Sequence, residues 1–212
     1  MQLLPHDRYC QIVVLLFSCL FAITSYRPPY PGDFLLQHVL TVIALIATVA
    51  IVRRYHLNRI SFTAIFLFLG LHLVGARYLY SNVPYDDWAR WLTGSTISER
   101  FGWERNHYDR LVHFCYGVFL AVPIFEILSR HVRLPHVWAA VLTVDIILST
   151  SALYELMEWG VAVFLAPEAA EAYNGQQGDM WDAHKDMTLA FLGAVFSVVG
   201  LSIARRAKRD QA

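Results

Sequence analysis

Long apolar stretches separated by short polar connections fill most of the chain. Each stretch has about the 20 residues with which an α-helix crosses the hydrocarbon core of a bilayer. The pattern predicts an all-α fold, a polytopic membrane helix bundle of about six transmembrane helices, as one integral membrane domain over residues 1–212. The predicted spans are Cys10–Tyr26, Phe34–Val52, Ile60–Tyr80, Asp109–Leu128, Val137–Phe164 and Asp186–Ala204.

The connections carry the residues that interrupt helices. Pro28, Pro29 and Pro31 punctuate the first connection, and Pro84 and Gly94 break up the long segment 81–108. Within that segment, we expect residues 86–93 to form a short helix that lies flat on the membrane surface. No small-residue cleavage site follows the first apolar run, so we expect a retained helix rather than a signal peptide.

Composition supports lipid as the solvent of this chain. Of its 212 residues, 57% are hydrophobic and 16% are charged, against about a quarter charged in soluble domains. The formal net charge is zero, so no overall positive field favours a nucleic-acid partner. The three cysteines have no CxxC spacing, which argues against a thiolate metal site or a disulfide framework.

The distribution of Lys and Arg predicts the orientation. With the N-terminus inside, ten of the 17 basic residues fall on the inner side, where the short loops carry almost no acid. Most outer basic residues belong to the segment 81–108 and its flanks, mixed with acidic residues. The charge rule therefore predicts that both termini face the cytoplasm.

Several ionisable residues interrupt the spans, although a charge at mid-bilayer costs on the order of 2.5–3.5 kcal/mol even on the lenient insertion scale. In the predicted topology they all approach the outer leaflet, and they come from four different helices. They are His72 in the third span, Asp109 and His113 in the fourth, Glu155 and Glu158 in the fifth, and Asp179, Asp182 and Asp186 at the start of the sixth.

Helical spacing places these residues on common faces. Asp109 and His113 are four apart, as are Asp182 and Asp186, and Glu155 and Glu158 are three apart. Small residues share the same faces and mark close helix contact in membranes, which turns the polar faces into the bundle. These small residues are Gly75, Ala76, Gly117, Gly193 and Gly200.

Carboxylates with one or two imidazoles suit a divalent cation such as zinc, manganese, iron or magnesium. We assign metal-ligand roles to His72, His113, Asp179, Asp182 and Asp186. Catalytic roles as acid, base or orienting group are assigned to Glu155, Glu158 and Asp109.

Each residue also has a structural interpretation. Asp109 is placed to cap a helix and pair with Arg105 or Arg110, and Asp182 and Asp186 suit a helix N-terminus. Two inner acids stand apart from the outer set: Glu126 lies four residues before Arg130 and should pair with it, and Asp145 suits a hydrogen-bonded structural role or a step in a proton path.

Four segments carry a family resemblance. The runs 105–114, 153–159 and 177–187, together with 72–81, resemble the YjdF-like family of bacterial inner-membrane proteins, a domain of unknown function. The resemblance implies a small multi-pass protein of the bacterial inner membrane, and it implies no activity.

Three functions remain open at this level. The first is a metal-dependent enzyme acting on a lipid or lipid-linked substrate, or another small molecule, at the outer leaflet. The second is a proton-coupled transporter that uses the acids of the fifth span. The third is a non-catalytic membrane scaffold.

Overall fold

A computed structural model describes residues 8–164 and 177–209, and within these residues every regular element is a helix. Six of the helices are long and apolar enough to cross a membrane, which confirms the polytopic bundle. They are α1 (Arg8–Ser25), α2 (Pro31–Tyr55), α3 (Arg59–Tyr78), α6 (Tyr108–Glu126, continued by the π-helical turn η1, Ile127–His131), α7 (His136–Phe164) and α9 (Asp182–Arg209).

The boundaries follow local chemistry. Pro31 opens α2 at a position where a missing N–H costs nothing. The side chain of Asn58 caps α3 by accepting a hydrogen bond of 2.9 Å from the Ser61 amide. The last helix begins at Asp182, one turn before the predicted Asp186, so both aspartates belong to its first turns.

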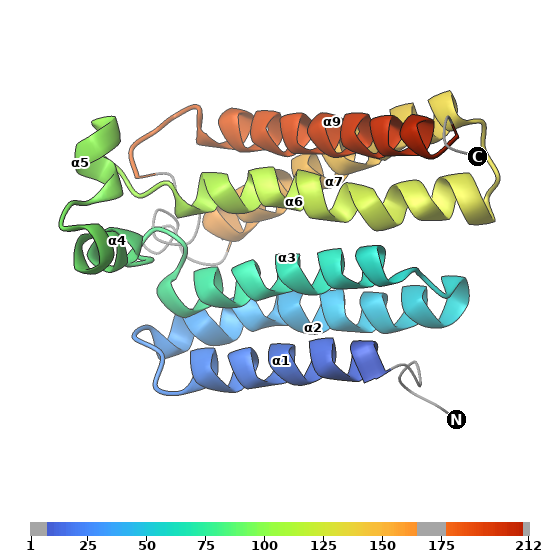
Figure 1. Ribbon diagram of the computed structural model, residues 1–212. Coiled ribbons are helices and arrows are strands. Elements are labelled where there is room, and N and C mark those ends of the chain that lie inside the picture. Colours follow the sequence, from blue (N-terminus) through green and yellow to red (C-terminus); the bar gives the residue numbers. More distant parts are fainter. Residues whose placement is uncertain (1–7, 165–176, 210–212) are drawn as a thin grey trace.

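The helices run side by side, with α6 at the centre (Figure 1). Helix α6 packs against α3, α7 and α9, whereas α2 packs against α3 and α1 packs against α3. The bundle thus has two layers: α1, α2 and α3 form one, and α6, α7 and α9 form the other. The contact of α3 with α6 joins them.

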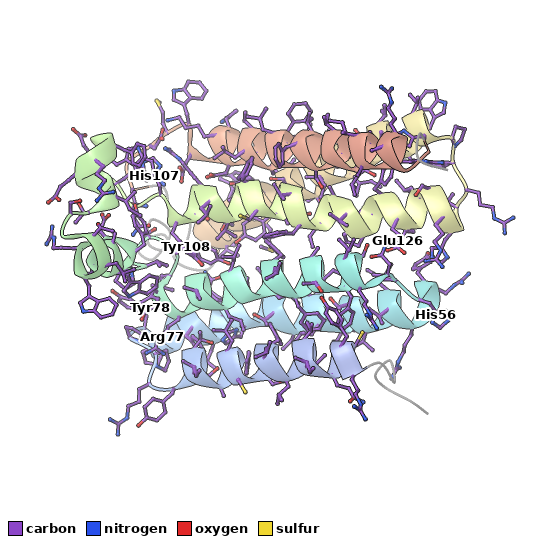
Figure 2. The ribbon with its side chains drawn as sticks, viewed as in Figure 1. His56, Arg77, Tyr78, His107, Tyr108 and Glu126 are labelled. Carbon is purple, nitrogen blue, oxygen red and sulfur yellow. The ribbon has the colours of Figure 1, made fainter. Side chains whose placement is uncertain are left out.

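The two ends of the bundle differ. The start of α1 and the end of α9 lie at one end, and the short helices α4 (Tyr85–Thr93) and α5 (Ile97–Phe101) lie at the other (Figure 1). Figure 2 shows His107 and Tyr108 at the α4 end of α6, and Glu126 at the opposite end. We call the α4 end the outer end, following the charge rule, which remains a prediction.

Side-chain contacts tie the outer ends of the helices together. Arg77, at the end of α3, donates hydrogen bonds of 2.7 and 2.8 Å to the carbonyls of Thr24 and Tyr26 (Figure 2). The predicted short helix in the outer segment is present as α4, whose Trp91 and Leu92 are exposed. That α4 rests on the membrane surface stays a prediction.

Candidate metal centre

Close contact between α6 and α9 positions the centre of the site. A side chain on Gly117 would meet the backbone carbonyl of Ala190, and one on Gly193 would meet the carbonyl of Phe114. Two helix backbones therefore touch at the glycines that the sequence marked as a contact face. Gly200 lies on the same predicted helix face, but it has open space beside it and takes no part in the contact between α6 and α9.

This contact brings acids and a histidine from three helices together. His113 Nε2 on α6 lies 3.7 Å from Asp109 Oδ1 and 3.6 Å from Glu155 Oε1 of α7. Asp186 of α9 offers an oxygen within 4.8 Å of ligand atoms on both Asp109 and His113. Glu158 is buried and lies close enough to Asp109 and Glu155 to interact with them electrostatically. We refer to Asp109, His113, Glu155, Glu158 and Asp186 as the outer cluster.

The separations within the outer cluster suit ligands of one ion. Atoms bound tetrahedrally to zinc at 2.0–2.2 Å lie about 3.4 Å from one another. The distances of 3.6 and 3.7 Å from His113 Nε2 are too long for good hydrogen bonds and close to that spacing. These two separations are therefore compatible with ligands of one ion, and the Asp186 oxygen lies within 4.8 Å of the ligand atoms of Asp109 and His113.

Two oxygens of the outer cluster lack a partner. Among the described residues, Asp186 Oδ1 and Glu155 Oε1 are buried without a hydrogen bond, and Asp186 is only 2% exposed. A buried acceptor left unpaired costs about 1–3 kcal/mol, and more when it is charged. Asp186 offers one of its oxygens to the group with Asp109 and His113, and Glu155 Oε1 lies 3.6 Å from His113 Nε2, so both carboxyl groups lie where a cation held by this group would interact with them.

The charges of the outer cluster also favour a bound cation. In the described ranges, the four carboxyl groups of the outer cluster form no ion pair with a lysine or arginine, and His113 is the one basic group within ion-pair distance of any of them. Two buried acids, Glu158 and Asp186, and two half-buried ones, Asp109 and Glu155, beside one imidazole need added positive charge or protons.

A second set of charged residues lies above the outer cluster. We call it the rim network: Arg105, Arg110, Asp179, Asp182 and Lys185. Arg105 Nη1 donates to Asp182 Oδ1 at 2.6 Å, and Arg110 Nη2 donates to Asp179 Oδ2 at 2.5 Å. Three cations thus face two acids, and the two arginines pair with the α9 segment rather than with Asp109.

The rim network fixes the protonation state of Asp179. A hydrogen bond of 2.5 Å from Lys185, together with the bond from Arg110, lowers the pKa of Asp179 to about 2. Nearby, partial burial and the positive charge of Arg110 lower the pKa of His107. Asp179 is therefore an ionised partner of basic side chains, and Asp182 is equally engaged by Arg105.

His72 has its own hydrogen-bonded partners. Its Nε2 lies 2.7 Å from Thr41 Oγ1 and its Nδ1 lies 2.5 Å from the Tyr80 hydroxyl. Thr41 in turn bonds to His38 Nδ1 at 2.9 Å. Both ring nitrogens of His72 are thus engaged by protein groups, and His72 lies outside the set of atoms that could share one ion.

A cavity of about 530 Å³ connects His72 to the outer cluster. Residues of α2, α3, α6 and α7 and the side chain of Tyr80 line it. Asp109 and His113 form part of its polar wall, together with Tyr154 and Ser151 of α7. The volume is in the range of small-molecule binding sites.

The inner acids behave differently from the outer ones. Glu126 accepts a hydrogen bond of 3.1 Å from Arg130, as the spacing predicts, and also accepts bonds from the Asn58 amide at the start of α3. Asp145 is exposed on α7, and the described structure gives it no hydrogen bond. The structure therefore does not support a hydrogen-bonded structural role for Asp145.

Sequence reasoning missed two tyrosines of the site. Tyr154 precedes Glu158 by four residues, so helical spacing alone would have placed it on the cluster face. Tyr80 follows the end of α3 in a left-handed conformation with φ of 53°, and its ring occupies the space that a Gly75 side chain would need. That position could not be read from periodicity, because it depends on a turn.

Comparison with known proteins identifies the family. Residues 9–207 match the family model described as "Predicted membrane protein (DUF2238)". The chain is 37% identical over 166 residues to "Inner membrane protein YjdF" of Escherichia coli (strain K12), which covers 77% of this chain and 74% of the relative. No solved structure matches. The resemblance drawn from the sequence motifs is confirmed, as is a multi-pass inner-membrane location, and the chain belongs to the DUF2238 family of membrane proteins.

Proposed function

We propose that this protein is a metal-dependent membrane enzyme that acts on a lipid or lipid-linked substrate at the outer leaflet. The observation that carries the proposal is the buried Asp186, which has an unpartnered Oδ1 and a ligand oxygen near Asp109 and His113, in a set of acids that pair with no lysine or arginine in the described structure. A divalent ion held there satisfies the oxygens and balances the charge.

The residues divide into ligands and supports. Asp109, His113 and Asp186 hold the ion in this proposal, since they are the residues whose ligand atoms lie within 4.8 Å of one another. Asp179 and Asp182 brace the start of α9 through the rim network. His72 orients Tyr80 at the cavity wall.

When bound, the ion would polarise a phosphoryl or acyl oxygen of the substrate. Glu155 is the general base in this proposal, because its Oε1 is buried, free of hydrogen bonds within the described structure, and 3.6 Å from His113 Nε2. It would take the proton of an attacking water and return it to the leaving oxygen. Glu158, which interacts electrostatically with Glu155, would be its partner in this proton transfer.

Metal analysis of the purified protein tests the proposal. Plasma mass spectrometry should find about one divalent ion per chain in the wild type, because a complete ligand set binds with high affinity. His113→Ala and Asp186→Asn should lose that ion. Asp145→Asn is the matched control, since Asp145 is an exposed acid on α7 about 15 Å along the helix from Glu155.

Two results would contradict the proposal. If wild-type protein purified without chelator carries no divalent ion, and added zinc, manganese, iron or magnesium is not retained, the metal-dependent mechanism is wrong. Equal metal content in wild type and His113→Ala would show that the ion sits elsewhere.

A further inference from the structure

The cavity beside the outer cluster changes character with depth. Its outer part is polar, with His72, Tyr80, Asp109 and Tyr154 on the wall. From the level of His72 inward the wall becomes apolar, formed by Leu69 of α3 and Leu40, Ala44 and Ala47 of α2. From Leu40 to Ala47 this apolar part extends about 10 Å across the middle of the α2 span, at 1.5 Å per helical residue.

Two polar groups in the deeper part bond to each other, whereas the buried Ser151 hydroxyl beside them has no hydrogen bond in the described structure. Tyr116 of α6 and Thr150 of α7 line the cavity and share a hydrogen bond of 2.6 Å between their hydroxyl oxygens. Thr150 also donates to the Ile146 carbonyl. Of the described lining, the inner part of the cavity thus offers a polar ligand the Ser151 hydroxyl, whereas the outer part presents Asp109, His113 and His72.

The cavity opens sideways to the bilayer. Ile43 of α2 is 57% exposed, and Ala47 of α2 and Thr150 of α7 are exposed as well, yet all three line the cavity. Helix α2 packs against α3, and it belongs to the layer opposite α7 (Figure 1). The opening therefore lies between α2 and α7, at a depth where only lipid surrounds the protein.

From these features we infer that the cavity binds one hydrocarbon chain of a membrane lipid, entering from the bilayer between α2 and α7 with its polar end at the outer cluster. The inference rests on the proposed function for what happens at that polar end. A lipid of the leaflet next to α4 already has its headgroup at this depth and its chain toward the membrane centre. It would enter without turning over.

Burial of the lining distinguishes a chain inside the cavity from bulk lipid. Leu69 is 2% exposed and Val112 is 6% exposed, so lipid surrounding the protein does not reach them. Both line the cavity, so a chain that occupies it would contact them.

Photolabelling of the full chain tests this inference. The protein would be reconstituted in vesicles of phosphatidylethanolamine and phosphatidylglycerol that contain palmitate with a diazirine near the chain end, then irradiated and mapped by mass spectrometry. We expect label on Leu69, in the middle of α3, because Val112 lies beside His113 at the polar end of the chain. Ala47→Phe should lower that labelling by about tenfold, because the aromatic ring takes the space of the chain.

Ala50→Phe is the matched control. Ala50 is also exposed on α2, but it does not line the cavity, so labelling of the buried positions should remain at the wild-type level. Label confined to lipid-exposed side chains, with no response to Ala47→Phe, would overturn the inference.

Metal content measured on the same samples separates the two proposals. Label on cavity residues of protein that contains no metal would support the chain site and refute the metal-dependent function. Bound metal with no label in the cavity would support the metal centre and refute the chain site. The substrate would then bind without a buried hydrocarbon chain.

Discussion

At the scale of single residues, the outer end of the bundle separates its acids into two kinds. Asp179 and Asp182 are neutralised by Arg105, Arg110 and Lys185. The carboxyl groups of the outer cluster, a turn deeper, have no such partners in the described structure. The first kind stabilises the fold as ion pairs, and the second keeps its oxygens available for an ion.

Asp179 gives a pH-dependent prediction. Its pKa in the folded protein is about 2, below the value near 4 of an unfolded aspartate. A lowered pKa means that the carboxylate contributes fully to stability above about pH 4, and that the contribution is lost as the pH falls toward 2. The melting temperature of wild type should exceed that of Asp179→Asn at pH 6, and the difference should shrink between pH 4 and pH 2.

A control variant isolates this effect. Asp87→Asn removes an exposed acid of α4 that forms no ion pair in the described structure, so its melting temperature should follow the wild type at every pH. A difference between wild type and Asp179→Asn that persists unchanged to pH 2 would contradict the assignment of Asp179 to an ionised pair.

At the scale of helices, the contact of α6 with α9 sets the geometry of the metal centre. Gly117 and Gly193 let the two backbones touch, and this places Asp186 opposite His113. Any side chain at these glycines would push the helices apart, because the nearest atoms are backbone and cannot move aside.

Two glycine substitutions in α9 distinguish the effect of this close contact from the effect of replacing a glycine on helix propensity. Gly193→Val should lower the melting temperature in detergent, at an overpacking cost of about 1–3 kcal/mol, and should also reduce metal content. Gly200→Val makes the same chemical change seven residues further along, where nothing lies within 4 Å, and should be tolerated. Equal melting temperatures and metal contents for the two variants would show that the close contact does not hold the site together.

Helical periodicity accounts for part of the site. The four-residue spacing of Asp109 and His113 placed them on one face, and the structure holds them 3.7 Å apart. The same spacing in Asp182 and Asp186 did not give a shared role, because Arg105 comes from a loop and pairs with Asp182 but not with Asp186. Contacts made by loops, such as those of Arg105 and Tyr80, carry no periodic signal.

At the scale of the whole molecule, six spans follow from hydropathy because each backbone must satisfy its hydrogen bonds within the bilayer. The cavity could not be predicted from hydropathy, since it depends on how two three-helix layers meet along α3 and α6. Sequence patterns define faces of single helices, whereas a cavity needs the relative positions of four.

The orientation of the bundle remains to be measured. The start of α1 and the end of α9 lie at the end opposite α4, so one assay fixes both (Figure 1). Green fluorescent protein fused to the C-terminus should fluoresce, because it folds in the cytoplasm, and alkaline phosphatase inserted after Gly102 should be active outside. Active phosphatase at the C-terminus would reverse the topology and place the outer cluster at the cytoplasmic leaflet.

The central claim is that the outer cluster binds a divalent ion through one histidine and carboxylates. X-ray absorption spectroscopy of the zinc-loaded protein tests this most directly. We predict nitrogen and oxygen ligands at about 2.0–2.2 Å, no sulfur, and the outer-shell scattering of one imidazole, which His113→Ala abolishes. A spectrum of hydrated zinc, or one that His113→Ala leaves unchanged, would contradict the assignment.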